Sequence, residues 1–461
     1  MVHSEGTSST MKTRFTFVLL LVTISSLFPP ASRGQAVVNL HEFSSTPGVF
    51  SGPNTDGAYP FHSLVLAGDT LYGTCGYGGQ AGGGNVFKIN TDGTGFTVVH
   101  DFLGYKNIDG LSPYCGMVLS GNTLYGTTMN GGLIFPVVFG TVFSVSTDGS
   151  GLTILQAFDH SDGGPVGGVV LSGNTLYGTT YKSIFSVNTD DWVYKVLHTA
   201  SGTDGFYPQG LTLSGNTLYG TTYYGGTWSN GTVYAMSTDG SGYTLLHSFS
   251  TTSGPTYTIT NTDGMNPSAG VTLSGDTLYG TATYAGILGG GTVFSLKTDG
   301  SGFKVLHSFD GTNGGAPSNL AIVGNTLYGA VSDGLSQKGR LFSMNTDGSG
   351  FTVLCTINQG FGAGGLAVTN NTLYGTTYYG GAAGTGTIFK FSLLPQLTIT
   401  CSGPNSVLTW PNSATGFTLQ STTNLAAPVW STVSATPAVV NGLNTVTNPV
   451  SGKQQFFRLS Q

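Results

Sequence analysis

The tripeptide Leu-Tyr-Gly occurs seven times in this chain of 461 residues, and no other feature constrains the fold as strongly. Successive copies are 53, 52, 42, 60, 49 and 46 residues apart. These spacings match the length of a propeller blade. The tyrosines of the seven copies are Tyr72, Tyr125, Tyr177, Tyr219, Tyr279, Tyr328 and Tyr374.

Three other strings recur with the same period, each in seven versions: Gly-Leu-Thr-Leu-Ser-Gly from Gly210, Gly-Thr-Val-Phe at 140–143 and 291–294, and Val-Leu-His-Ser-Phe at 305–309. Each string is short, alternating and rich in β-branched or aromatic residues, which predicts a strand. Ser-Gly-Asn and Thr-Asp-Gly-Ser-Gly lie between them and supply the positive φ angles of tight hairpins. Seven units of four antiparallel strands predict an all-β, seven-bladed β-propeller.

The hairpin order also predicts how the propeller closes. Gly-Leu-Thr-Leu is the innermost strand of each unit and Val-Leu-His-Ser-Phe the outermost. The seventh unit ends at 386–391 without an outermost strand, whereas Val38 to Phe43 precedes every inner strand. We therefore expect Val38 to Phe43 to pair with Thr387 to Phe391 and close the ring. The two hairpin turns on one face are uniform, and the loops of the opposite face vary in length.

The first 36 residues read as an upstream extension and a secretory signal. Lys12 and Arg14 precede the apolar stretch from Phe15 to Phe28, and a small-residue cleavage site ends at Ala36. Fourteen mostly apolar residues are too few to span a bilayer, and no later segment is longer and as apolar. We expect a secreted or cell-surface protein, with the propeller at 37–395.

The charge content limits the classes of binding partner, and the cysteine content limits the kinds of metal site and disulfide. Only 7% of residues are charged and the formal net charge is −6, so a nucleic acid is not an expected partner. The four cysteines show no metal-ligand spacing. Because export permits disulfides, Cys75 and Cys115 could pair across neighbouring units; alternatively the cysteines are buried thiols.

Residues 396–461 lie beyond the repeat and form a separate module. Short alternating segments predict strands at 397–401, 406–410, 416–422, 430–433, 444–447 and 456–459. A small β-sandwich is the expected fold. The predicted core residues are Trp410, Trp430, Phe456 and Phe457.

The strings Leu-Tyr-Gly-Thr-Thr, Gly-Thr-Val-Phe, Thr-Asp-Gly and Leu-His-Ser-Phe resemble those of the bacterial GloVer tandem-repeat family. The resemblance runs from about residue 37 to 391 and covers all seven units. It implies an exported protein and neither a known activity nor catalytic residues. The ending Gln455-Phe456-Phe457-Arg458-Leu459 resembles a C-terminal β-module of exported bacterial proteins rather than a hydrophobic anchor.

Two sets of polar residues recur in the repeat. Five carboxylates precede the innermost strands and could ring the channel mouth and hold Ca²⁺, although turn formation explains every copy. Histidines recur on the outermost strands, far from the axis, where packing or edge hydrogen bonding fits better than a metal site. The carboxylates are Asp56, Asp109, Asp162, Asp204 and Asp263; the histidines are His41, His100, His198, His247 and His307.

Aromatic residues are concentrated in the variable loops. Rings with a polar edge could stack on a glycan or a surface-protein partner, or could pack the loops against each other. The candidate ligand-binding residues are Tyr77, Tyr181, Tyr207, Tyr223, Tyr224, Trp228, Tyr284, Tyr378 and Tyr379, with Tyr59, Tyr114 and Phe206 in the inter-unit loops.

Catalytic signatures are scarce. Beyond the signal the chain has one glutamate, Glu42, and two arginines, Arg340 and Arg458. Neither a Gly-x-Ser-x-Gly elbow nor a zinc motif is present, and a glycosidase would have to use an Asp-only pair. We expect a non-catalytic scaffold without a cofactor. A polysaccharide hydrolase or lyase using the loop aspartates, and a structural surface protein without a ligand, remain alternatives.

Overall fold

The computed structural model describes residues 37–48, 52–103, 109–132, 139–254, 259–332, 338–357, 364–369, 371–393, 395, 397–402, 405–412, 417–441, 443–449 and 454–460. The signal predicted in residues 1–36 lies outside the described residues. Within the described part, the chain is all-β apart from one 3₁₀ turn, η1 (Gly202–Asp204). No described helix has the length and apolar character needed to cross a membrane.

The described part of the repeat region forms seven antiparallel sheets, which we number first to seventh by the chain order of their Leu-Tyr-Gly strands. The strand order in each follows the predicted hairpin order, which confirms that prediction. The first strands of the seven sheets are β3 (Val65–Ala67), β7 (Val118–Ser120), β11 (Val170–Ser172), β15 (Phe206–Ser214), β19 (Thr272–Ser274), β23 (Ala321–Val323) and β27 (Ala367–Thr369). The second strands, which carry Leu-Tyr-Gly, are β4 (Thr70–Tyr77), β8 (Thr123–Thr128), β12 (Thr175–Thr179), β16 (Thr217–Tyr224), β20 (Thr277–Ala282), β24 (Thr326–Ser332) and β28 (Thr372–Thr377).

The outer half of each sheet contains the other two repeated strings. The third strands are β5 (Asn85–Asn90), β9 (Thr141–Ser146), β13 (Ser183–Asn188), β17 (Thr232–Ser237), β21 (Thr292–Lys297), β25 (Gly339–Asn345) and β29 (Thr387–Ser392). The fourth strands of the first six sheets are β6 (Thr97–Asp101), β10 (Thr153–Ala157), β14 (Tyr194–Thr199), β18 (Thr244–Ser248), β22 (Lys304–Ser308) and β26 (Thr352–Ile357). The first sheet has an additional short strand, β2 (Ala58–Pro60), which pairs with β4.

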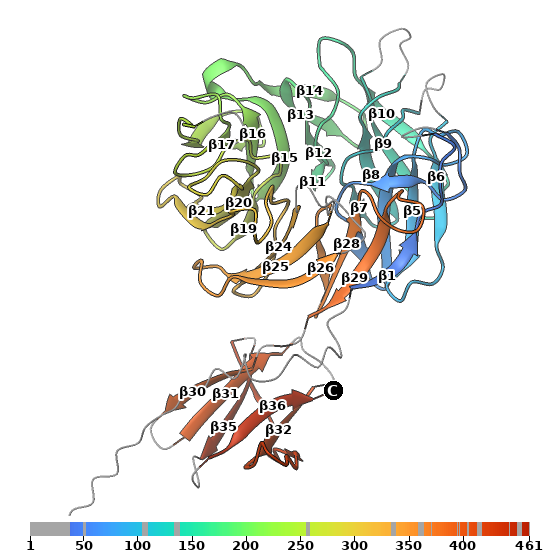
Figure 1. Ribbon diagram of the computed structural model, residues 1–461. Coiled ribbons are helices and arrows are strands. Elements are labelled where there is room, and N and C mark those ends of the chain that lie inside the picture. Colours follow the sequence, from blue (N-terminus) through green and yellow to red (C-terminus); the bar gives the residue numbers. More distant parts are fainter. Residues whose placement is uncertain are drawn as a thin grey trace, which may run out of the picture. The chain divides into compact units, whose positions relative to one another are not determined.

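The N-terminal strand β1 (Val37–Glu42) is the fourth strand of the seventh sheet. It pairs antiparallel with β29, with Asn39 opposite Phe389 and Glu42 opposite Thr387. Figure 1 shows these two strands side by side, although they come from opposite ends of the repeat. The predicted pairing of the N-terminal strand is therefore confirmed.

The turns between third and fourth strands owe their uniformity to a local hydrogen bond. In Thr-Asp-Gly-Ser-Gly, the Asp carboxylate accepts a hydrogen bond from the backbone N–H two residues later, as Asp148 does from Ser150 at 2.9 Å. The Ser150 hydroxyl also donates to Asp148, and these two bonds lower the pKa of Asp148 to about 2. Such Asx turns give the hairpin a fixed geometry.

Apolar clusters join the sheets in succession. Each of seven clusters contains residues from two sheets that are consecutive in the repeat. The one formed by the last and first sheets contains Phe43 and Ile388 from the seventh sheet and Leu71 and Phe87 from the first. This successive packing of four-stranded sheets is the organisation of a β-propeller.

A repeated threonine adds hydrogen bonds between neighbouring sheets. In five sheets, the threonine that follows Leu-Tyr-Gly donates its hydroxyl to a backbone carbonyl of the next sheet, as Thr221 does to Ala269 at 2.8 Å. Thr376 of the seventh sheet donates to His62 of the first at 3.2 Å. These bonds satisfy buried polar groups where the sheets approach one another.

The C-terminal segment forms two further antiparallel sheets. One consists of β30 (Thr398–Ser402), β31 (Asn405–Pro411), β34 (Ala438–Val440) and β35 (Leu443–Pro449), and the other of β32 (Thr418–Thr422), β33 (Ser431–Thr432) and β36 (Phe456–Ser460). Trp410 and Leu408 of the first sheet share an apolar cluster with Leu419 of the second and with the half-buried Phe457. The predicted strands are present, and β34 is an additional strand.

Two of the four predicted core residues, Trp430 and Phe456, are not part of the apolar cluster around Trp410. The guanidinium of Arg458 instead lies 4.4 Å from the centre of the Trp430 ring. A guanidinium stacked on an indole ring is a favourable cation–π contact.

Candidate functional site

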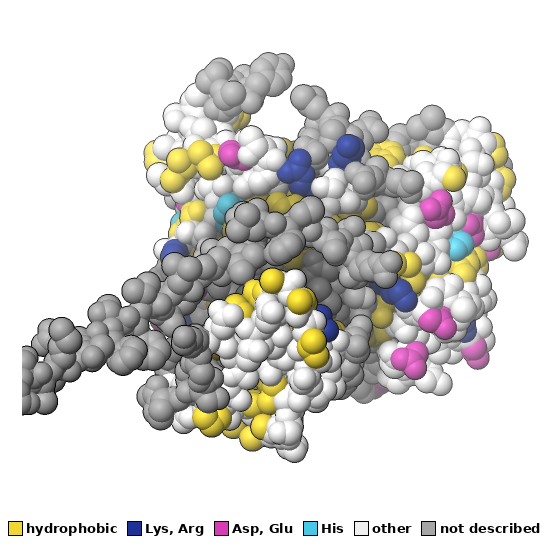
Figure 2. Space-filling model, turned by 60° about the horizontal axis from the view of Figure 1, so that its bottom comes forward, with side chains coloured by type: hydrophobic (Ala, Val, Ile, Leu, Met, Phe, Trp, Pro, Cys, Tyr) yellow, Lys and Arg dark blue, Asp and Glu magenta, His cyan; other side chains and the backbone are white. Residues whose placement is uncertain are grey.

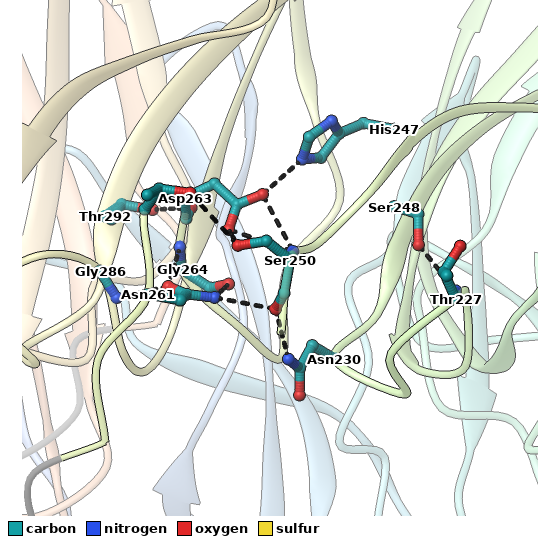
Figure 3. A network of polar contacts seen from close by, with 11 residues as sticks. Thr227, Asn230, His247, Ser248, Ser250, Asn261, Asp263, Gly264, Gly286 and Thr292 are labelled. Carbon is teal, nitrogen blue, oxygen red and sulfur yellow. Dashed lines mark hydrogen bonds and ion pairs between the residues drawn. The ribbon is translucent and has the colours of Figure 1, made fainter. Parts of the chain in front are cut away.

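The repeated histidines and aspartates, which the sequence presents as separate features, contact each other. Figure 3 shows this network around Asp263, in the loop after β18. His247 Nε2 lies 2.9 Å from Asp263 Oδ2, and the backbone N–H of Ser250 donates to the same oxygen at 3.1 Å. The Ser250 hydroxyl donates to Oδ1. One carboxylate thus ties the loop to the end of the fourth strand.

The same contact recurs in other loops. His41 Nε2 lies 3.0 Å from Asp56, and His198 Nε2 lies 3.1 Å from Asp204. The corresponding His100–Asp109 distance is longer, 3.5 Å. Where the sequence replaces Asp by Asn, the side chains of Asn313 and His307 are 3.3 Å apart.

Five of the loops after the fourth strands contain a repeated aspartate. Asp162 belongs to the loop after β10, which is the strand of these five that has no histidine. Gln156 occupies the histidine position there, and the Tyr194 hydroxyl from the next sheet donates to Asp162 at 3.1 Å instead. The carboxylate is therefore engaged in this loop too, through a different donor.

A β-bulge precedes the histidine position in all seven fourth strands. Bulges redirect the side chains that follow them. In four sheets the histidine ring also stacks on an aromatic ring of the next sheet, as His247 does on Phe303 with centroids 3.6 Å apart. Each of these four histidines, His41, His198, His247 and His307, therefore links its loop to the neighbouring sheet.

The order of contacts in this network does not suit nucleophilic catalysis. In a serine triad the histidine lies between serine and aspartate and accepts the serine proton. Here Asp263 lies between Ser250 and His247, and the same order holds for Ser44, Asp56 and His41. For Asp56, burial raises the pKa, but the hydrogen bonds from His41 and Ser44 more than offset this and leave its pKa below the ordinary value.

The five candidate calcium ligands lie in five different loops. The described residues contain no group of three or more His, Cys, Asp or Glu side chains positioned for a metal ion. The four aspartates with a histidine neighbour and Asp162 are each held within their own loop region. The structure thus does not bring these carboxylates together at a channel mouth.

A central cavity of about 230 Å³ lies between the first strands of the sheets. Its lining comes from the first six sheets and includes His62, Ser63, Gln209 and Asn319 among many glycine and aliphatic residues. His62 is the titratable residue among the lining residues, and burial lowers its pKa to about 4. None of the described residues that line this cavity is a carboxylate, so these residues do not supply the carboxyl pair of a glycosidase.

Eleven of the twelve aromatic residues predicted in the variable loops, together with Phe61, form two clusters of six rings. The first cluster joins the seventh, first and second sheets, and the second joins the third, fourth and fifth. Members of the first cluster are Tyr59, Phe61, Tyr77, Tyr114, Tyr378 and Tyr379. Members of the second are Tyr181, Phe206, Tyr207, Tyr223, Tyr224 and Tyr284.

The clusters contain both buried and open rings. Tyr59 is buried, whereas Phe61 is 46% exposed in the first cluster. In the second, Tyr224 and Tyr284 are each 48% exposed and Phe206 is 43% exposed. The clusters thus contain rings that pack the loops against each other as well as rings that are exposed. Sequence reasoning omitted Phe61, whose signal is its place directly after the loop proline.

Trp228 lies outside both clusters. It is 56% exposed in the loop between β16 and β17. Of the nine predicted ligand-binding residues, the other eight are brought together in two groups rather than one.

The two cysteines that could have paired, Cys75 and Cys115, are buried free thiols. The disulfide that their neighbouring sheets allowed is therefore not formed. Burial raises the pKa of the Cys115 thiol to about 11 and that of Cys75 well above its ordinary value. A thiol with a raised pKa is a poor nucleophile.

Charged side chains are scattered over the described surface of the face in Figure 2, whereas apolar side chains gather in small groups. In the C-terminal segment the most exposed apolar residues are Val429, at 78%, and Val439, at 62%. The surface is therefore largely neutral in this view.

Two stretches of the chain, residues 34–183 and 255–423, match the Gloeobacter/Verrucomicrobia repeat. The chain belongs to this repeat family, as its repeated strings indicated. No curated protein matches the chain.

Three solved structures that match this member of the family have low sequence identity to it. Hydrazine synthase from Kuenenia stuttgartiensis is 16% identical, with 72% of this chain and 96% of that chain covered and a TM-score of 0.49. Oligogalacturonate lyase from Vibrio parahaemolyticus is 9% identical, with 78% and 98% covered and a TM-score of 0.48. A chain of a nidogen/laminin complex is 14% identical, with 62% and 92% covered and a TM-score of 0.39.

Proposed function

We propose that this repeat protein is an exported, non-catalytic scaffold that binds a glycan or protein partner through its loop-variable face. In this proposal residues 37–395 form a seven-bladed β-propeller closed by the N-terminal strand. Residues 396–461 form a small β-sandwich that aids attachment or secretion, and residues 1–36 are removed on export to the cell surface or medium.

The fold part of this proposal is supported by the succession of sheets. Seven four-stranded arrangements, seven shared apolar clusters and the β1–β29 pairing fit a ring without free edges. Closure of this kind protects strand edges from intermolecular pairing. The two C-terminal sheets, which share a core around Trp410, fit a small sandwich.

The binding part is supported by one observation above all: two groups of partly exposed aromatic rings lie at the loops of variable length. Exposed rings with hydroxyl edges supply contact area and hydrogen bonds at a low cost in conformational entropy. Loops on a rigid scaffold are the usual location of binding residues.

The alternative of a polysaccharide hydrolase or lyase needs carboxylates that face a substrate cleft. Asp56, Asp162, Asp204 and Asp263 instead accept hydrogen bonds from histidine, serine or tyrosine, and Asp109 accepts one from the Leu103 backbone N–H; none of the five lines the central cavity. These contacts favour the scaffold over the enzyme.

A glycan array and a binding screen against cell-surface fractions, using the chain from residue 37 to 461, test the proposal. We expect retention on at least one glycan or surface protein, and loss of retention when Phe61 and Tyr224 are both replaced by Ser. Absence of any retained ligand would leave the structural surface protein as the better explanation. Shortening of an array glycan by the wild-type chain would favour the enzyme.

A further inference from the structure

Tyr59 and Tyr207 occupy the same position in two loops and share an uncommon backbone conformation. Each precedes the proline of an Asp-Gly-x-Tyr-Pro segment, with φ of 57° and 65°. A positive φ is rare for a bulky side chain and persists only where the surroundings fix it. Residues at this position in three other loops, Ser112, Asn266 and Ala316, share the conformation but have no ring. The backbone shape thus belongs to the repeat, whereas the ring is particular to two loops.

Each of these tyrosines contacts a tyrosine from the preceding sheet. The ring of Tyr59 lies 5.1 Å from that of Tyr378, and the ring of Tyr207 lies 4.7 Å from that of Tyr181. Tyr378 and Tyr181 both follow Leu-Tyr-Gly-Thr-Thr directly, so they too are equivalent in the repeat. The two clusters therefore share an equivalent pair of tyrosines, each within a separate set of three sheets.

Each cluster contains at least one exposed ring that contacts buried or half-buried rings. Tyr59 is buried beneath the first, where Phe61 is open, and the half-buried Tyr207 and Tyr223 support the open Tyr224 in the second. The ring of Phe61 contacts those of Tyr114 and Tyr378 edge to face, and the ring of Tyr224 contacts that of Tyr223 in the same way. Rings held by such contacts need little further ordering when a ligand binds.

The clusters are also electrically neutral. Burial raises the pKa of Tyr223 to about 12 and the pKa of Tyr378 above its ordinary value, so these hydroxyls remain protonated. Lys182, beside Tyr181, donates its ammonium group to the carbonyl of His160 at 2.8 Å. The two arginines of the exported chain, Arg340 and Arg458, belong to neither cluster. An anionic ligand would find no guanidinium partner at these rings.

We propose that the two aromatic clusters are equivalent binding sites for a neutral polysaccharide, and that one polymer engages both at once. This inference rests on the proposed binding function and specifies its ligand. A duplicated site matches a ligand that repeats along its length, whereas a protein partner would need about 800 Å² of continuous surface on this chain. Two linked weak contacts gain affinity because the second is intramolecular, by a factor on the order of 10² or more.

The test uses the chain from residue 37 to 461, with a soluble neutral β-glucan, a neutral galactomannan and their hexasaccharides as probes. Polygalacturonate serves as the acidic comparison. The variants are Phe61→Ser in the first cluster, Tyr224→Ser in the second, and the pair together. Trp192→Ser is the matched control, because Trp192 is 52% exposed but lies in the turn between β13 and β14, at the opposite end of its sheet.

We expect two hexasaccharides of one neutral glycan to bind per chain, and one after either single substitution. Affinity for the parent polymer should fall by a factor on the order of 10² in each single variant and be lost in the double variant. Trp192→Ser should bind as the wild type does. If either serine variant unfolds at a lower temperature than the wild type, the ring-conserving variants Phe61→Tyr and Tyr224→Phe provide the comparison. Both should bind as the wild type does.

Three results would overturn the inference while leaving the proposed function standing: a stoichiometry of one, binding of polygalacturonate alone, or binding of a surface protein alone. If none of the glycans, polygalacturonate or cell-surface fractions is retained, the proposed function itself fails.

Discussion

The aromatic ring of Phe294 lies directly across Gly280 on the neighbouring strand. A Cβ atom placed on Gly280 would come within 2.4 Å of Phe294 Cζ. The same relationship links the glycine of every Leu-Tyr-Gly copy to the aromatic residue opposite it, with separations from 2.3 to 2.7 Å. The repeated glycine is therefore required by a repeated ring, which explains why Leu-Tyr-Gly and Gly-Thr-Val-Phe occur together.

We predict that Gly280→Ala lowers the free energy of unfolding by about 1–3 kcal/mol, because the added methyl group must displace a fully buried ring. Chemical denaturation monitored by tyrosine and tryptophan fluorescence measures the loss. Gly116→Ala is the control, since a Cβ there meets nothing within 4 Å. It should be neutral or slightly stabilising. Equal effects of the two substitutions would contradict the role given to the ring.

The strand order could be predicted from sequence because its signals are local. Alternating apolar residues predict the strands, and the tight Ser-Gly-Asn and Thr-Asp-Gly turns allow only hairpin neighbours. The pairing of β1 with β29 followed from counting the strands of each unit. The seventh unit has no outermost strand of its own, and the chain has one extra outermost strand before the first unit. The strand order within a sheet needed only residues of one repeat, and the closing pair needed only the order of the strings along the chain.

The contacts of the candidate site depend on the packing of different repeats and were not predictable in the same way. His198 and Asp204 are six residues apart, whereas His247 and Asp263 are sixteen apart, so no fixed spacing reveals the pair. The two aromatic clusters combine loops from three sheets each, and Tyr59 and Tyr378 are distant in sequence. The positive φ of Tyr59 follows from the loop, not from its residue type.

Phe43 tests whether the N-terminal strand is an integral part of the repeat fold. It is 1% exposed in the cluster formed by the seventh and first sheets, and Phe309 occupies the equivalent position after β22. Both Phe43→Ala and Phe309→Ala should cost about 3–5 kcal/mol of unfolding free energy. Thermal unfolding of the two variants provides the comparison. A much smaller loss for Phe43→Ala would mean that β1 detaches without unfolding the remaining sheets.

Asp263 is predicted to be a structural residue rather than a catalytic one. Asp263→Ala removes the acceptor for His247 and for the Ser250 backbone N–H, and should cost about 1–3 kcal/mol. Asp263→Asn should cost less, because Asn313 has the corresponding contact with His307 in the next loop. Denaturant unfolding ranks the variants, with Asp276→Asn as a control because Asp276 is largely exposed. Full stability of Asp263→Ala, combined with loss of an activity on a polysaccharide, would reverse this assignment.

His62 should make the stability of the protein depend on pH between about 4 and 6.5. Burial against the central cavity lowers its pKa from 6.5 to about 4, so in this range the unfolded chain binds a proton that the folded chain does not. Stability associated with His62 is therefore complete above pH 6.5 and decreases as the pH falls toward 4. Because part of the ring faces the cavity, we expect a loss on the order of 2 kcal/mol. His62→Ala removes the titrating group. Alanine already occupies the equivalent position of the fifth sheet, as Ala269. Unfolding free energies of the two proteins, measured from pH 7 to pH 4, should converge as the pH falls, whereas parallel curves would show that His62 is protonated equally in both states.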